Sequence, residues 1–342
     1  MALQCRFNFI LSPFSFCKPK IQTLSPFSPT LYTSSSSDPK LSAQRHKVRN
    51  TVCAVTSKEN SFGSSAVADT DIFKLTYLEV NGWLWEVNGL KLLVDPILVG
   101  NLDFGMPWLS DGAKKTLKNF SLSDLPDQID CLLITQSLDD HCHLRTLRPL
   151  SQKYPNLRVI ATRNAKTLLD PLFTNVTYIE PGQSHQISTA DNASVEVRAT
   201  GGPIVGLPWE PPEKSYMVTS PRGQLSLYFE PHCLNEENIV EKLQADIVIT
   251  PVTKQLLSGL TLVSGQEDAV KLAKLLKAKF VVPMSKGDLD AKGLLTGFLQ
   301  PQGTTESFKA LMSQELPRVQ VLEPTPGQPL EIRPPQNLRL AS

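Results

Sequence analysis

The segment IDCLLITQSLDDHCH, at residues 129–143, indicates the class of the fold. Residues 129–135 form a largely apolar run, which is typical of a strand buried on both faces. Titratable side chains follow almost at once, namely Asp139, Asp140, His141 and His143. α/β proteins commonly place functional side chains in the loop after such a strand. We therefore predict an α/β fold with a functional site where this strand ends.

Short β-branched and apolar runs surround this strand and predict further strands. Asn88-Gly89 predicts a tight hairpin turn between strands at 83–87 and 90–94. Ser264 and Glu267 have the spacing of a capping box and predict the start of a helix. Residues 100–127 have no strand pattern and predict a loop. The remaining predicted strands cover residues 75–80, 158–162, 177–180, 194–200, 216–219, 225–229, 245–252, 280–283, 319–322 and 330–332.

Composition excludes several classes of protein. The chain has 342 residues with a formal net charge of +1, so no strong field indicates a nucleic acid partner. No apolar run approaches the roughly 18 residues that a transmembrane helix needs. Beyond residue 54 the cysteines are Cys131, Cys142 and Cys233, an odd number without a Cys-x-x-Cys pair. A disulfide framework or a zinc ribbon is therefore not expected.

Residues 1–54 differ in composition from the rest of the chain. They contain seven Lys or Arg residues, a single acid (Asp38) and a run of four serines at 34–37. A basic, hydroxylated and acid-poor leader is typical of an organellar transit peptide, and the Ser and Pro content favours the chloroplast. We predict a chloroplast transit peptide at 1–54, a linker at 55–70, one domain at 71–335 and a tail at 336–342, with the plastid stroma as the location.

Asp140 and His141 have the chemistry of metal ligands. A tight turn can direct two adjacent side chains toward the same ion. The carboxylate supplies charge and the imidazole supplies a neutral nitrogen, a combination that suits zinc, iron or manganese.

The string LLITQSLDDH at 132–141 resembles the strand-end motif Thr-His-x-His-x-Asp-His of the metallo-β-lactamase superfamily. LLVDP at 92–96 is similar to the opening of its lactonase-like branch. LYFEPHC at 227–233 resembles the strand that ends in Gly-Asp-Thr, and residues 245–251 with 281–285 look like the last strand–helix–strand unit. The resemblance implies a four-layer αββα sandwich over residues 72–332, with the active site along one edge of both sheets.

The sequence also departs from the motif of the family. Gln136 and Leu138 stand where the family has its first two histidines, Ser285 stands at the last one, and residues 199–202 contain none. His232 aligns with the bridging aspartate. The resemblance therefore implies a divergent member that retains Asp140, His141 and His232 as ligands of one divalent metal ion.

Three interpretations of this site remain open. In the first, the three ligands hold one metal ion, and a metal-bound water hydrolyses an ester, lactone or phosphoester. In the second, the site contains no metal, and its carboxylates and imidazoles perform acid–base work or bind a ligand. In the third, the protein is a catalytically inactive member of the fold that binds a ligand or a protein.

We name candidate residues for each role. The expected catalytic residues are Asp140, His232 and Glu230. Gln136, Trp108 and Trp209 are weaker candidates for the wall of the substrate pocket, the two tryptophans because they lie in loops rich in Pro and Gly. The expected partner is a small molecule, and the sequence leaves the oligomeric state open.

Overall fold

The computed structural model describes residues 71–188, 194–202, 214–233, 240–285 and 289–334, all within the unit formed by residues 65–342. The predicted leader, linker and tail, and also Trp209, lie outside the described residues.

The first sheet has seven strands in the order β19-β1-β2-β3-β5-β6-β7. The first four pair antiparallel, and β3, β5, β6 and β7 pair in parallel. Asn88 and Gly89 join β2 to β3 with φ values of 49° and 87°, so the predicted hairpin turn is confirmed. The strands are β1 (Phe73–Tyr77), β2 (Trp83–Val87), β3 (Leu90–Val94), β5 (Cys131–Ile134), β6 (Arg158–Ala161), β7 (Asn175–Tyr178) and β19 (Pro329–Ile332).

The second sheet also has seven strands, in the order β18-β15-β12-β11-β10-β9-β8. Neighbours from β8 to β11 pair antiparallel, and those from β11 to β18 pair in parallel. The strands are β8 (Ser184–Ser188), β9 (Ser194–Gly201), β10 (Lys214–Thr219), β11 (Ser226–Phe229), β12 (Ile247–Pro251), β15 (Phe280–Met284) and β18 (Gln320–Val321).

The inner faces of the two sheets form the main hydrophobic core. Trp83 and Trp85 alternate with half-buried residues along β2, so both indoles point into this core and are fully buried. The ring of Trp85 meets that of Phe229 on the opposite sheet edge to face, with 5.4 Å between ring centroids. Contacts of this kind bury the large apolar side chains that alternate along both sheets.

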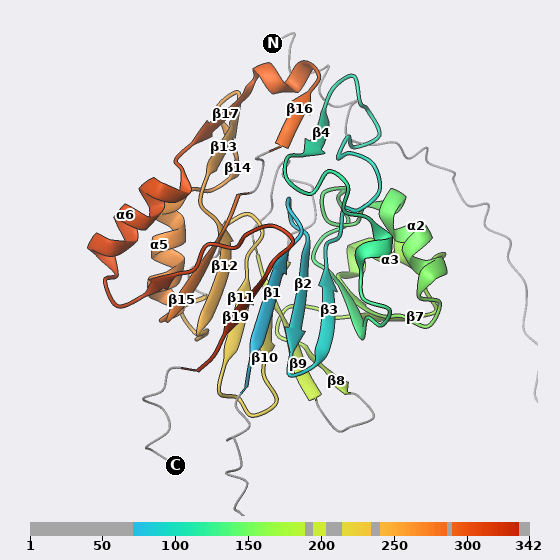
Figure 1. Ribbon diagram of the computed structural model, residues 1–342, viewed down its shortest axis with the longest axis horizontal. Coiled ribbons are helices and arrows are strands. Elements are labelled where there is room, and N and C mark those ends of the chain that lie inside the picture. The colour runs from blue at the N-terminus through green and yellow to red at the C-terminus, as the bar shows by residue number, and fades with distance from the viewer. Residues whose placement is uncertain (1–70, 189–193, 203–213, 234–239, 286–288, 335–342) are drawn as a thin grey trace, which may run out of the picture. The chain divides into compact units, whose positions relative to one another are not determined.

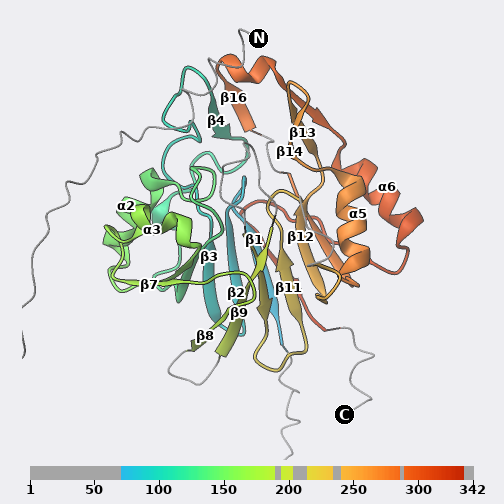
Figure 2. The same cartoon turned by 180° about the vertical axis from the view of Figure 1, so that it is seen from behind.

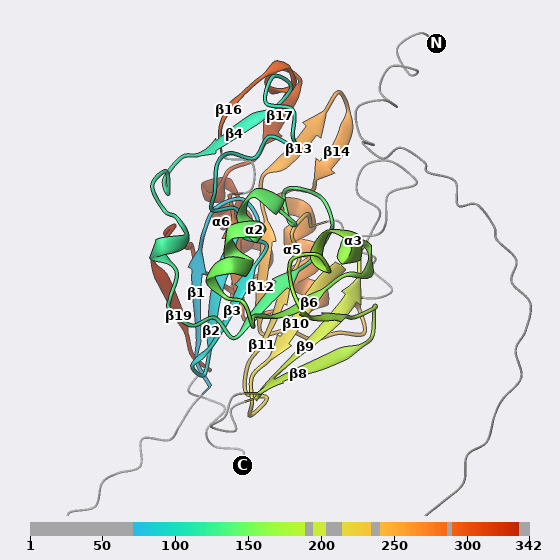
Figure 3. The same cartoon turned by 90° about the vertical axis from the view of Figure 1, so that its right-hand side faces the viewer.

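Helices cover the two outer faces. A second apolar cluster joins the outer face of the first sheet to α2 (Leu144–Lys153) and α3 (Lys166–Leu169). A third joins the second sheet to α5 (Gln266–Leu275) and α6 (Thr305–Glu315). The result is the predicted αββα sandwich, with α5 and α6 on one side of the sheets and α2 and α3 on the other (Figures 1 and 2). Figure 3 shows it from the side of α2 and α3. No helix of the described residues is both long and apolar enough to cross a membrane.

Short elements at one end of the sandwich form a cap, which we define as residues 111–114, 254–263 and 289–302. The cap contains a three-stranded sheet, a two-stranded sheet and a 3-10 helix (Figure 1). The prediction of a loop throughout 100–127 is therefore wrong, because β4 pairs with a strand that lies far away in the sequence. The elements are β4 (Asp111–Lys114), β13 (Lys254–Leu257), β14 (Leu260–Val263), β16 (Leu289–Lys292), β17 (Leu299–Gln302) and η3 (Leu294–Gly297); η1 (Leu122–Asp124) and η2 (Arg163–Ala165) lie outside the cap.

The predicted capping box before α5 is not formed. The N-cap residue is Gly265, which has no side chain to accept a hydrogen bond. Ser264 precedes it, and its backbone N–H donates to the carbonyl oxygen of His232 at 2.9 Å. A Cβ atom on Gly265 would lie 3.0 Å from Cβ of Lys254, so the close approach of β13 favours glycine at this position.

Candidate metal centre

Four segments bring polar side chains to the same edge of the sandwich. The loop after β5 carries Asp140 and His141, and the segment after β11 carries His232. Asp95 directly follows β3, the neighbour of β5, and Asn81 lies in the turn between β1 and β2. Parallel neighbours end at the same edge of a sheet, which explains why residues far apart in the sequence meet here.

The three predicted ligands converge. Oδ2 of Asp140 lies 3.2 Å from Nε2 of His141 and 3.7 Å from Nε2 of His232. All three donor atoms lie within 4.8 Å of one another, and all three residues are buried. Ligand atoms around one tetrahedral zinc ion are about 3.3 Å apart, given metal–ligand distances of about 2.0–2.1 Å. The donor set therefore fits one divalent ion.

Asp95 orients the imidazole of His141. Its Oδ2 atom lies 2.9 Å from Nδ1 of His141, and both side chains are fully buried. The backbone N–H of Thr135 donates to Oδ1 of Asp95 at 3.0 Å, and the Thr135 hydroxyl donates to Oδ2. A carboxylate that accepts the second N–H of a ligating histidine is a common feature of metal sites, because it directs the other nitrogen toward the ion.

Buried charge determines the protonation of His141. Burial alone would lower its pKa, but the carboxylates of Asp140 and Asp95 outweigh this effect and raise the pKa to about 10. An opposite charge within a few ångströms favours the charged form of a buried group. The same negative surroundings that stabilise a proton on this imidazole also favour a cation at Nε2.

Asn81 fastens Asp140 from the opposite side of the cluster. Its Nδ2 atom donates to the backbone carbonyl of Asp140 at 3.0 Å and to Oδ2 at 3.2 Å. The same nitrogen lies 3.2 Å from Nε2 of His141. Asn81 is fully buried, so its amide contributes to the polar environment of the donor atoms. The sequence pattern did not indicate a role for Asn81, because Asn81-Gly82 is also an ordinary turn sequence.

Unusual backbone conformations cluster around these residues. Glu79 and Val80 precede Asn81 with φ values of 66° and 57°, Asp95 has 38°, and Cys233, directly after His232, has 54°. A positive φ is uncommon for residues other than glycine and is a clear outlier for a β-branched residue such as Val80. Such strain persists only where the surroundings enforce it, and it concentrates at functional sites.

A cavity of about 320 Å³ adjoins the cluster. Asp140 and His232 belong to its lining, whereas His141 does not. Two of the three residues that would hold an ion therefore also line this cavity. Three protein ligands and an accessible position are the arrangement of catalytic rather than structural zinc sites.

The other predicted site residues lie outside this cluster. Glu230 is fully buried, and its Oε2 atom accepts hydrogen bonds from the hydroxyls of Ser215 and Tyr228. Gln136 is also buried, and its side-chain oxygen accepts the N–H of Ser137 at 2.8 Å. Trp108 is 61% exposed and does not line the cavity. The structure thus brings together the three predicted ligands but not these residues.

Comparison with known proteins agrees with this architecture. A family profile described as the beta-lactamase superfamily domain matches residues 74–285, more than half of the chain. The chain belongs to the β-lactamase superfamily. No curated protein matches its sequence.

Solved structures show the same fold at low sequence identity. Igni18, a metallo hydrolase from Ignicoccus hospitalis, is 16% identical with a TM-score of 0.50, over 76% of this chain and 98% of that chain. YhfI, a metallo-β-lactamase fold protein from Bacillus subtilis, is 11% identical with a TM-score of 0.53, over 77% and 100%. CmlA, a diiron β-hydroxylase from Streptomyces venezuelae, is 16% identical with a TM-score of 0.54, over 78% and 55%. These similarities establish the fold of this superfamily member.

Proposed function

We propose that this β-lactamase-superfamily protein is a metal-dependent hydrolase with a single-ion site at Asp140, His141 and His232. The observation that carries the proposal is the convergence of one carboxylate oxygen and two imidazole nitrogens within 4.8 Å beside a cavity. A divalent ion bound there would supply a Lewis acid and would lower the pKa of a bound water toward neutrality.

The residues of the chain have separate roles in this proposal. Asp95 accepts a hydrogen bond from Nδ1–H of His141, which would direct Nε2 toward the ion. Asn81 holds Asp140 through two hydrogen bonds, which fixes the carboxylate relative to both imidazoles. His232 and Asp140 line the cavity, so a substrate there would lie next to residues that would hold the ion. Preorganised ligands of this kind lower the cost of reorganisation during the reaction.

The reaction class and the location are parts of the same proposal. The expected reaction is hydrolysis of an ester, lactone or phosphoester, and the expected ion is zinc, iron or manganese. The fold is shared with a metallo hydrolase, which supports hydrolysis as the reaction type. The basic leader at 1–54, rich in Ser, supports the chloroplast as the location.

A second candidate function is a catalytically inactive protein that binds a ligand or a protein partner. The replacement of expected histidines by Gln136, Leu138 and Ser285 favours this alternative, because the site then keeps fewer ligands than the family motif supplies. Leu138 lines the cavity instead of offering a ligand atom.

Metal content distinguishes the two functions. We expect elemental analysis of the purified full chain to find close to one zinc, iron or manganese ion per molecule. His232→Ala should lose this ion. His185→Ala is the matched control, because His185 lies in β8 and outside the donor cluster, and it should retain the ion. A folded wild-type chain without metal, even after incubation with each ion, would contradict the hydrolase.

A further inference from the structure

The cavity beside the proposed metal centre is predominantly apolar. Twelve of its eighteen lining residues are apolar, and among the described residues the lining contains no Lys or Arg. Asp140 and His232 are the titratable members of the lining. An anionic phosphoester requires cationic or donor groups around its charged oxygens. This cavity offers an apolar surface instead.

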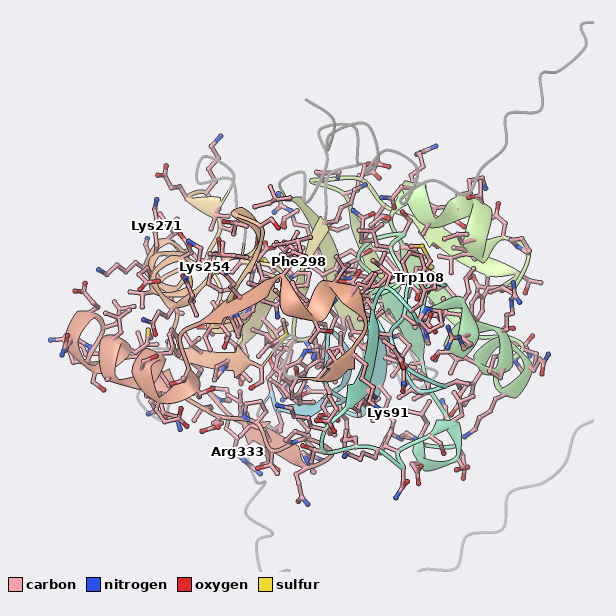
Figure 4. The ribbon with its side chains drawn as sticks, turned by 90° about the horizontal axis from the view of Figure 1, so that it is seen from above. Lys91, Trp108, Lys254, Lys271, Phe298 and Arg333 are labelled. Atoms are coloured by element: carbon pink, nitrogen blue, oxygen red, sulfur yellow. The ribbon has the colours of Figure 1, made fainter. Side chains whose placement is uncertain are left out.

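The cap supplies most of the apolar wall. Leu257, Leu289, Leu295 and Leu299 come from four different cap elements and all line the cavity. Two exposed aromatic side chains, Trp108 and Phe298, lie on the face of the molecule formed by the cap (Figure 4). Phe104 both lines the cavity and is exposed, so the apolar surface continues from the cavity to solvent.

The size of the cavity limits its occupant. About 320 Å³ lies near the lower end of the range for small-molecule sites. A site of this size is on the scale of a small molecule that carries one hydrocarbon chain.

We propose that the cavity binds the hydrocarbon chain of a medium-chain acyl ester, with the ester carbonyl at Asp140 and His232. This inference rests on the proposed hydrolase function. Hydrolysis breaks the bond between the acyl carbon and the alcohol oxygen and forms a bond from the acyl carbon to the oxygen of water. One proton of the water passes to the alcohol, which leaves, and the acyl group leaves as a carboxylic acid.

Chain length provides the first test. The full chain, loaded with metal, is assayed with 4-nitrophenyl esters of linear acids from acetate to dodecanoate. We expect kcat/KM to rise about fourfold per added methylene until the cavity is full, because each buried methylene contributes about that factor. A flat series, with acetate hydrolysed as well as octanoate, would overturn the chain-binding role and leave the hydrolase function intact.

Binding provides a test that does not depend on catalysis. Calorimetric titration with butanoate and octanoate is compared in wild type and Leu257→Asp, with the fold checked by circular dichroism. We expect octanoate to bind at least tenfold more weakly to the variant, because a carboxylate replaces part of the apolar wall. Leu260→Asp is the matched control, since Leu260 belongs to the same pair of strands but is exposed and does not line the cavity.

Leu295→Gln is the second wall variant, for use if Leu257→Asp does not fold. Weaker octanoate binding in a folded wall variant, with unchanged binding in Leu260→Asp, supports the proposal. Equal binding of octanoate by wild type and both wall variants would overturn it. If octanoate binds but the chain holds no metal and hydrolyses no ester, the hydrolase function is contradicted and the chain-binding role is not.

Discussion

Asp95 is the residue on which the orientation of His141 depends. It is fully buried, 2.9 Å from Nδ1 of the imidazole, and its other contacts come from Thr135. No other carboxylate among the described residues contacts Nδ1 of His141 at this distance. Asp95 is thus the carboxylate that faces Nδ1 of this imidazole, beside the hydroxyl of Thr135 at 2.8 Å.

Asp95→Asn tests this role. We expect affinity for the metal to fall 10–100-fold, because the variant no longer offers a charged acceptor for the Nδ1 proton. The measurement is competition with a chromogenic chelator on the full chain.

Asp71→Asn is the control for the loss of a buried carboxylate. Asp71 is also fully buried, but it accepts hydrogen bonds from Asn88, Ser220 and Gln224, outside the donor cluster. We expect this variant to keep the wild-type metal affinity. Equal losses in both variants would show that the effect of Asp95→Asn is general and not due to His141.

Among the elements, β4 shows how the cap is anchored. Its residues pair with β16, from Lys114 opposite Leu289 to Asp111 opposite Lys292. The carboxylate of Glu79 accepts the backbone N–H groups of residues 115–117, at 2.7–3.2 Å, directly after this strand. Hydrogen bonds thus connect the strained turn that carries Asn81 to the segment directly after β4, so the turn and this cap strand position each other.

Lys114, the last residue of β4, is half-buried, and its buried Nζ atom has no hydrogen-bond partner among the residues that the structure describes. Burial lowers its pKa to about 8 from 10.5, against the opposing effect of Glu79. Between pH 8 and pH 10.5 the unfolded chain binds more protons at Lys114 than the folded chain does. The free energy of unfolding therefore rises with pH in this window. Below pH 8 Lys114 is charged in the folded chain as well, so the folded state carries the full free-energy cost of burying this charge.

Lys114→Met removes this cost. We expect the variant to be more stable than wild type by about 1–2 kcal/mol at pH 7, and the difference to shrink as pH rises from 8 to 10.5. Urea denaturation across this pH range measures it. Lys118→Met is the control, because Lys118 lies in the segment after β4 but is exposed. A stability difference that is independent of pH would contradict the depressed pKa.

At the scale of the whole molecule, the proposed ligands connect the two sheets. Asp140 and His141 follow a strand of the first sheet, and His232 follows a strand of the second. An ion bound by all three residues would therefore add a connection between two sheets whose facing surfaces are mainly apolar. An ion that binds only the folded state stabilises it by about 2.7 kcal/mol at 100 times its Kd.

Chelation tests this connection. We expect removal of the metal with EDTA to lower the Tm of the wild-type chain by about 5–10 °C, given about 2–4 °C per kcal/mol for a domain of this size. The Tm of His232→Ala should not respond to EDTA. Differential scanning calorimetry measures both. The same shift in the variant would mean that the chelator acts at another site.

Local patterns determined the framework of this protein. The apolar run at 129–135, the alternation in β2 and the turn at Asn88-Gly89 each specify a strand or hairpin through their own residues, so the α/β class followed from these patterns. The αββα arrangement was implied by the resemblance of residues 132–141 to a family motif. Asp140 and His141 also indicated a metal site, because consecutive residues are close together in any fold.

The surroundings of that site depend on packing between segments that are distant in the sequence. Asn81 and His232 reach Asp140 because two sheets pack with their strand ends at one edge, a relation that no local period records. The cap formed where residues 111–114 meet residues 289–292, although neither short segment has a pattern that predicts the pairing. Side chains brought together from distant segments therefore determine the cavity and its apolar character, and these properties required the folded chain.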